Sequence, residues 1–334
     1  MSGDEFAFSR RAFLGGSAAV GAALAAKAAA TEAPPVDLTG KFVLITGSSS
    51  GFGRLAALHF ARSGATVIAS MRNLKGGKRQ EAQELSDIAA AEKLKLSVVE
   101  IDVTDDAQVS AGVASAEKIA GGALDAVLNN AGIGVGGPAE LYDMQNLQRA
   151  FDVNFFGYQR VARAALPKMR ARRQGLLVEV SSQLGRLLIP NLGAYCATKF
   201  AVEAMFETMA YELAPFGVEV TIIQPGGYPT KIWDNGAQYF DALLEAADQE
   251  RKDAYVGHIE MASGLLGGQY STDPMDVPRA IADIIAMPPG KRPLRKPVHP
   301  NTQATDALNA AHAQVQATVL GQGRYKEWRD AVAD

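Results

Sequence analysis

Three features of the sequence predict an α/β fold in which a doubly wound parallel sheet carries helices on both faces. Short runs of apolar and β-branched residues recur along the chain, as in "KFVLIT" and "LSVVEID". Segments of ten or more residues with helical spacing separate these runs, and glycine or polar residues mark the boundaries. Near-continuous apolar strands that alternate with helices are typical of a parallel sheet that is buried on both sides.

The expected elements follow one another in a regular order from residue 41 onward. Strands are predicted at 41–46, 65–71, 96–102, 124–132, 176–182 and 218–224. Helices are predicted at 54–64, 78–93, 105–121, 141–173 and 194–214. Right-handed crossovers make such a sheet doubly wound, and its ligands bind beyond the carboxyl ends of the strands. The residues that directly follow each strand are therefore the candidates for a functional site.

Composition and charge exclude several classes of function. Hydrophobic residues make up 48% and charged residues 21% of the 334 residues, which is ordinary for a globular chain. The formal net charge is −3 and no long basic run occurs, so we expect no nucleic-acid partner. The single cysteine, Cys196, excludes an internal disulfide and a cysteine metal cluster, and we interpret it as a packing residue. The four scattered histidines lack a metal-binding spacing, so no metal site is expected.

The first thirty residues differ from the rest of the chain. Arg10 and Arg11 precede a weakly apolar run of alanine and glycine, which ends in small residues near Ala30. This order is typical of a signal peptide, and "SRRAFLG" resembles the bacterial twin-arginine signal. The apolar run is too short and too polar for a stable membrane span. We expect a twin-arginine-type signal peptide at 1–30, a linker at 31–39 and a periplasmic protein, the alternative being a disordered extension on a cytoplasmic one.

The turn after the first predicted strand has the composition of a phosphate-binding site. In "TGSSSGFGR", Gly47, Gly51 and Gly53 allow the backbone to turn sharply and to approach a ligand closely. The helix that begins near Phe52 directs its positive end to the same place. An ordinary glycine turn is the alternative, but the position between a strand and a helix favours phosphate.

Polar residues also follow the next three strands. Arg72 stands where an acidic residue would favour NAD, and an arginine can pair with a 2′-phosphate, so NADP is expected and NAD is possible. In the alternative, Arg72 is a solvated residue of a basic region. Asp102 either meets an adenine amino group or caps the next helix with Thr104 and Asp105. The segment "NNAG" at 129–132 ends the fourth strand and suits a close approach of the backbone.

A tyrosine and a lysine share one helix face in "AYCATKFAVEAM". Tyr195 lies four residues before Lys199, which is about one helical turn. A nearby cation favours the phenolate, so we expect Lys199 to lower the pKa of Tyr195 from its usual value of about 10. Chance is the alternative, because a lone YxxxK pattern is common.

Four motifs occur in a single order along the chain: TGxxxGxG, NNAG, a serine after the fifth strand, and YxxxK. With this combination, residues 40–230 resemble the single-domain branch of the short-chain dehydrogenase/reductases. The resemblance implies a Rossmann domain at 40–300 with about seven parallel strands, and an NAD(P)-dependent oxidoreductase that interconverts a carbonyl and an alcohol. It also implies a homodimer or a homotetramer. The alternative function is an exported NADP-binding sensor or scaffold without turnover.

The resemblance also assigns roles to residues of this chain. Tyr195 is implied as the proton donor or acceptor, and Lys199 as the cation that tunes it and binds the nicotinamide ribose. Ser182 would donate a hydrogen bond to the substrate oxygen, and Asn154 would hold a water of a proton relay. The expected cofactor-binding residues are Gly47, Ser49, Ser50, Gly51, Phe52, Gly53, Arg72, Asp102, Val103, Asn130, Ala131, Gly132, Tyr195, Lys199, Pro225, Gly226 and Thr230.

The segment after the sixth strand is the expected source of substrate specificity. Residues 228–272 contain several aromatic, leucine and methionine side chains, which indicates a helical lid over an apolar pocket. Such a pocket would accept a small to medium hydrophobic ketone or alcohol, although these residues could also only cover the core. The tail at 301–334 is rich in alanine, has a helical pattern and contains no motif.

Overall fold

The structure is a computed structural model that describes residues 36–74, 79–266 and 271–332. The predicted signal peptide at 1–30 lies outside these residues, as do residues 31–35 of the predicted linker. Among the described residues, no helix combines the length and the apolar character needed to cross a membrane.

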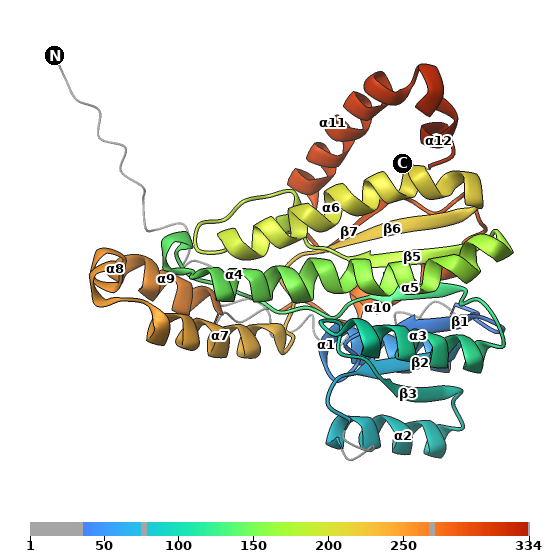
Figure 1. Cartoon of the computed structure of the whole chain (residues 1–334), viewed down its shortest axis with the longest axis horizontal. Coiled ribbons are helices and arrows are strands. Elements are labelled where there is room, and N and C mark those ends of the chain that lie inside the picture. Colours follow the sequence, from blue (N-terminus) through green and yellow to red (C-terminus); the bar gives the residue numbers. More distant parts are fainter. Residues whose placement is uncertain (1–35, 75–78, 267–270, 333–334) are drawn as a thin grey trace, which may run out of the picture. The chain divides into compact units, whose positions relative to one another are not determined.

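Seven parallel strands form one sheet in the order β3-β2-β1-β4-β5-β6-β7 (Figure 1). The strands are β1 (Phe42–Ile45), β2 (Thr66–Met71), β3 (Leu96–Glu100), β4 (Ala126–Asn129), β5 (Gly175–Val180), β6 (Val218–Pro225) and β7 (Arg295–Val298). The doubly wound sheet is therefore confirmed, and each of the six strands located from the sequence lies within its predicted segment or within one residue of it. The sequence pattern did not locate β7, because "RKPV" has no apolar run; Pro297 is tolerated there at the sheet edge.

Helices cover both faces of the sheet. One face carries α1 (Gly51–Arg62), α2 (Gln80–Glu92) and α10 (Asp276–Ala286), and the other carries α3 (Asp106–Ala120), α5 (Gly157–Arg172) and α6 (Gly193–Leu213). Alternate strand residues face opposite layers, since Val43 packs in the first layer and Leu44 in the second. Phe60 of α1 and Phe206 of α6 are fully buried, and each such side chain contributes about 1.5–3 kcal/mol to stability.

The single helix predicted at 141–173 is interrupted. It consists of α4 (Met144–Phe151), a π-helical turn at Asp152–Phe156 and then α5. The N–H of Gly157 donates to the carbonyl oxygen of Asp152, five residues back, which widens the helix by one residue. Turns of this kind occur often at functional sites, and this one contains the fully buried Asn154.

Two helical segments lie outside the sheet layers. After β6 come α7 (Ile232–Ala246), α8 (Gln249–Ala254) and α9 (Val256–Leu266), of which α7 and α9 share a small apolar cluster with Leu141. At the end of the chain, α11 (Gln303–Leu320) and α12 (Lys326–Asp330) lie beside α6 (Figure 1). Both segments are helical, as the sequence pattern predicted for 228–272 and 301–334.

Candidate active site

A cavity of about 760 Å³ opens at the carboxyl ends of the central strands. With the exception of Gly53, every cofactor-binding residue expected from the sequence lines it, and so does Ser182. Gly53 lies on α1, where an added Cβ would stand 2.5 Å from the Gly47 carbonyl oxygen and the Asn130 amide. Gly53 therefore allows the helix to approach the turn, and does not itself face the cavity.

The glycine turn between β1 and α1 is a cradle made of main chain. Gly47 and Gly51 have φ angles of +69° and +55°, which favour glycine, and a Cβ on Gly47 would stand 2.7 Å from Ala131 Cα. The hydroxyl of Thr46 accepts hydrogen bonds from the N–H groups of Asn130 and Ala131, at 2.9 and 3.0 Å, which fixes the ends of β1 and β4 together. The N-terminus of α1 opens into this cradle, so the geometry and the helix dipole suit a phosphate.

Two arginines line the cavity where β2 ends. Arg72 is exposed, and Arg79 Nη1 donates a hydrogen bond of 2.6 Å to the Arg72 carbonyl oxygen. Arg79 also pairs with Glu81 at 3.0 Å. The sequence pointed only to Arg72, because Arg79 is separated from β2 and looked like part of a basic surface.

Asp102 lines the cavity and also hydrogen-bonds Thr104 within its own loop. Its Oδ1 accepts hydrogen bonds from the N–H and the hydroxyl of Thr104, at 3.0 and 2.8 Å, while the residue also lines the cavity. The cap of α3 is Asp105, whose side chain accepts from the N–H groups of Ala107 and Gln108. Asp102 thus shapes the loop at the cavity rather than capping the helix.

Three of the four predicted catalytic residues come together at the cavity wall. Tyr195 and Lys199 lie on α6, and Ser182, which follows β5, lines the same cavity. Lys199 is 3% exposed. Its Nζ lies 5.8 Å from the centre of the Tyr195 ring and donates a 2.7 Å hydrogen bond to the Val180 carbonyl oxygen. Tyr158 supports it from α5, with its hydroxyl 3.5 Å from Nζ. No local motif marks Tyr158 in the sequence.

Burial dominates the protonation of this group. It raises the pKa of Tyr195 to about 12, and the hydrogen bond with Ser182 offsets only part of that rise. Burial also lowers the pKa of Lys199 to about 7, against the opposing effect of the Glu179 and Glu203 charges. The prediction that Lys199 lowers the pKa of Tyr195 is therefore wrong in direction, because the loss of water around the phenol outweighs the neighbouring cation.

Asn154 lies apart from the other three. Its Oδ1 accepts from the Ile133 N–H at 2.8 Å, and its Nδ2 donates to the Ile133 carbonyl at 3.0 Å and to the Thr198 hydroxyl at 3.2 Å. The residue is fully buried and does not line the cavity. Its side chain thus connects the segment after β4 to α6, and the contact of Asn154 with a relay water stays a prediction.

The far end of the cavity has an apolar wall. It is lined by Val135, Leu187, Ile189, Leu192, Ile232, Trp233 and Leu266. Arg149 of α4 adds one cation, with its guanidinium 4.7 Å from the centre of the Tyr239 ring of α7. The sequence placed this wall in the segment after β6, but the contribution of α4 carried no signal, since Arg149 resembles any surface arginine.

Known proteins are similar to this chain in sequence. The family described as short chain dehydrogenase matches residues 41–238. An uncharacterized oxidoreductase of Bacillus subtilis (strain 168), YusZ, is 35% identical over 248 residues, which cover 73% of this chain and 83% of that protein. Retinol dehydrogenase 8 of Homo sapiens is 34% identical over 260 residues, which cover 76% of this chain and 80% of that protein.

Solved structures agree with the sequence relatives. A short-chain dehydrogenase from Streptomyces avermitilis superimposes with a TM-score of 0.65 at 32% identity, covering 87% of this chain and 97% of the other. A short chain dehydrogenase/reductase from Burkholderia phymatum in complex with NAD gives a TM-score of 0.68 at 27% identity, covering 85% and 97%. The chain belongs to the short-chain dehydrogenase/reductase family of NAD(P)-dependent oxidoreductases.

Proposed function

We propose that this protein interconverts a carbonyl and an alcohol on a small to medium hydrophobic substrate, with Tyr195 as the general acid or base. The observation that supports this most strongly is the convergence of Ser182, Tyr195 and Lys199 on one wall of the cavity whose other end is the glycine cradle. A phosphate cradle and an acid–base pair in one cavity suit a reaction between a dinucleotide and a carbonyl.

The cradle fits the diphosphate of a nicotinamide dinucleotide. A Cβ on Gly47 would collide with Ala131, so this glycine lets the turn pack closely against the end of β4, and the positive φ angles of Gly47 and Gly51 shape the main chain of the cradle. When bound, the nicotinamide supplies or accepts the hydride. Arg72 and Arg79 support NADP as the preferred form, because guanidinium groups pair well with a 2′-phosphate.

The residues of the chain can handle the proton and the charge. With a pKa of about 12, Tyr195 is protonated at neutral pH, so in the direction of reduction it can give its phenolic proton to the carbonyl oxygen. The Ser182 hydroxyl can donate a hydrogen bond to the same oxygen as its negative charge develops. The Lys199 ammonium then lies close enough to stabilise the phenolate that remains.

Turnover of carbonyl compounds tests the proposal. NADPH oxidation would be followed with a panel of apolar ketones and aldehydes, including retinal because a relative is named a retinol dehydrogenase. We expect turnover with some members of the panel and a loss of kcat of about 10³-fold in Tyr195→Phe, since general acid–base catalysis contributes about 10²–10⁴-fold. Equal turnover in Tyr195→Phe would reject the assignment of Tyr195. Tight NADPH binding without any turnover would favour the sensor or scaffold.

We also propose that the protein is exported through the twin-arginine pathway to the periplasm. The support is the order of Arg10, Arg11, the apolar run and the small residues near Ala30. The test is cell fractionation of the full chain beside a variant with both arginines changed to lysine. Retention of both proteins in the cytoplasm would contradict export, whereas a periplasmic wild type beside a cytoplasmic variant is the expected result.

A homodimer or a homotetramer is proposed for the assembly. Support comes from apolar side chains that stay exposed on the central helices: Phe156 is 47%, Phe200 38% and Met205 37% exposed. Light scattering on the purified protein measures the mass directly. The mass of a monomer at micromolar concentration would reject this part of the proposal.

A further inference from the structure

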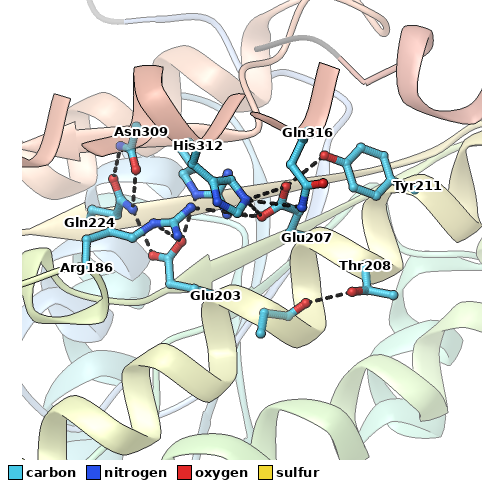
Figure 2. Close-up of polar contacts among 11 residues, drawn as sticks. Arg186, Glu203, Glu207, Thr208, Tyr211, Gln224, Asn309, His312 and Gln316 are labelled. Carbon is cyan, nitrogen blue, oxygen red and sulfur yellow. Dashed lines mark hydrogen bonds and ion pairs between the residues drawn. The ribbon is translucent and has the colours of Figure 1, made fainter. Parts of the chain in front are cut away.

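A group of charged side chains surrounds Glu203 and Glu207 of α6, which lie four and eight residues after Lys199 on the same helix. It consists of Arg186, Glu203, Glu207, Arg295 and His312, named here the α6 charge cluster. Figure 2 labels all of these residues except Arg295. Arg295 of β7 is 2% and Glu203 3% exposed at their side chains, and Arg295 Nε lies 2.8 Å from Glu203 Oε2. Of these five residues, only Glu203 acts on the proposed catalytic group, through the effect of its charge on the pKa of Lys199.

Two residues of the cluster, Glu207 and Arg295, favour each other's charged form. Burial works to raise the pKa of Glu207, but Arg295, Tyr211 and His312 outweigh it and hold that pKa below its ordinary value. For Arg295, burial works to lower the pKa, and the charges of Glu203 and Glu207 reverse this. Buried charges of this kind depend strongly on their partners, so the loss of one partner disturbs the groups that remain.

One side of the cluster holds the turn that carries Ser182. Ser182 begins a 3₁₀ turn at Gln183–Gly185, and its hydroxyl accepts from the Leu184 N–H at 3.1 Å. Arg186 directly follows this turn, and its Nε lies 3.5 Å from Glu203 Oε2. Gly185 packs on Glu203 as well, since a Cβ there would stand 2.9 Å from Glu203 Cγ. Glu203 thus supports the serine turn at two neighbouring positions.

The other side of the cluster holds the C-terminal helix. His312 of α11 places its Nε2 2.8 Å from Glu207 Oε2 (Figure 2). Gln224 of β6 donates to Glu203 Oε1 at 2.9 Å and accepts from Asn309 of α11 at 2.7 Å. One helical segment at the end of the chain is therefore connected to the serine turn through two glutamates of α6.

A second arginine–glutamate pair provides a comparison, because it connects parts of the sheet without contacting the site. Arg292, which precedes β7, pairs with Glu219 near the start of β6. Their side chains are 7% and 21% exposed, and neither residue lines the cavity. This pair joins β6 to the β7 region without touching the site. The α6 charge cluster instead joins β7 to α6, and through Arg186 it also contacts the end of the turn that Ser182 begins.

We propose that Arg186 and Glu203 are positioning residues that hold Ser182 in place for the reacting carbonyl, and that α11 secures them from outside through Glu207 and His312. This inference rests on the proposed carbonyl–alcohol interconversion. A position error of the Ser182 hydroxyl weakens a hydrogen bond to the developing charge, and such errors lower kcat more than they change nucleotide binding.

The test compares Glu203→Gln with Glu219→Gln, two neutral and nearly isosteric changes of buried glutamates that pair with arginines. We expect kcat for NADPH-dependent reduction to fall at least tenfold in Glu203→Gln and to stay within twofold in Glu219→Gln. The dissociation constant for NADPH should change less than twofold in both variants. Arg186→Gln should lose a similar factor in kcat, with partial recovery in Arg186→Lys, and His312→Gln should lose about threefold.

Hydrogen exchange measures positioning without turnover. Amides of residues 181–187 should exchange at least tenfold faster in Glu203→Gln than in the wild type, and at an unchanged rate in Glu219→Gln. Equal kcat and equal exchange in the two glutamine variants would overturn the inference. If Glu203→Gln does not fold, the Arg186→Gln and Arg186→Lys pair decides by the same two measurements. A wild type that reduces no carbonyl would instead reject the proposed function, and the exchange rates would still decide the positioning role.

Discussion

The two ends of the cavity are built from different parts of the chain. At the nucleotide end, the walls are mostly main chain. The positive φ angles of Gly47 and Gly51 set their shape, together with the hydrogen bonds that the Thr46 hydroxyl accepts from the N–H groups at the end of β4. At the substrate end, the walls are side chains on α4, α7 and α9, such as Ile232 and Leu266. A main-chain site tolerates few residue types, whereas a side-chain wall can change its residues and keep the fold.

Lys199 lies where the two ends meet, and its replacement should have the largest effect. In Lys199→Met we expect kcat for reduction to fall about 10³-fold, because the phenolate left on Tyr195 loses its stabilising cation. The pH dependence should change too. With a pKa of about 7, the wild-type ammonium is charged below that pH and neutral above it, so the rate of reduction falls as the pH rises through about 7.

The pH–rate profile of kcat measures this directly. The Lys199→Met variant should show no transition near pH 7, while binding of NADPH, followed by fluorescence, reports whether the site is intact. A transition of unchanged midpoint in the variant would assign it to another group and contradict the role of Lys199.

At the nucleotide end, a single methyl group should be harmful. Gly47→Ala places a Cβ 2.7 Å from Ala131 Cα at a φ of +69°, so we expect NADPH affinity to fall about 100-fold, which is about 2.7 kcal/mol. Gly121 is the matched control, because its φ is +67° and nothing lies within 4 Å of its Cβ position at the end of α3.

Both glycine variants should lose about 1–2 kcal/mol in the free energy of unfolding, from left-handed backbone strain alone. Only Gly47→Ala should lose nucleotide affinity, measured by titration calorimetry. Equal affinities in the two variants would show that the main-chain cradle does not set nucleotide binding, and the contrast between the two ends would fail.

The same contrast explains what the sequence could predict. The sequence predicted the parts of the site in which geometry restricts residue identity. Main-chain geometry restricts the glycine turn and "NNAG", and helical spacing restricts the pair Tyr195 and Lys199. The six apolar strands are readable because a sheet buried on both sides needs them. The four-residue β7, Arg149 and the π-helical turn at Asp152–Phe156 carried no such restriction. The predicted direction of the Tyr195 pKa shift is wrong, because spacing reveals a neighbouring charge but not the depth of burial.

Arg72 contributes a side chain to the nucleotide end of the cavity, where most of the wall is main chain. In Arg72→Gln we expect the NADPH dissociation constant to rise about tenfold and the NADH constant to stay unchanged, because NADH lacks the 2′-phosphate with which we propose that Arg72 pairs. Tenfold corresponds to about 1.4 kcal/mol, the lower part of the range for hydrogen bonds to charged groups, as suits an exposed arginine. Equal rises for both nucleotides would assign Arg72 to the fold of the loop instead of the phosphate.

The smallest effect is expected from Arg149 at the substrate end. Among the cavity-lining residues in the described part of the chain, it is the only cation besides Lys199 that lies away from the nucleotide end. It is exposed, so its attraction for a substrate carboxylate is about 0.2–1 kcal/mol, which is at most about fivefold in kcat/KM. We expect a keto acid to be preferred over its methyl ester by about this factor in the wild type and not in Arg149→Gln.

Tyr239→Phe keeps the aromatic ring under the guanidinium and should keep the preference, because the stacking depends on the ring face and not on the hydroxyl. If Tyr239→Phe and Arg149→Gln lose the preference equally, the pair holds α4 and α7 together and does not attract the substrate carboxylate. The side-chain wall would then depend on specific contacts between its helices.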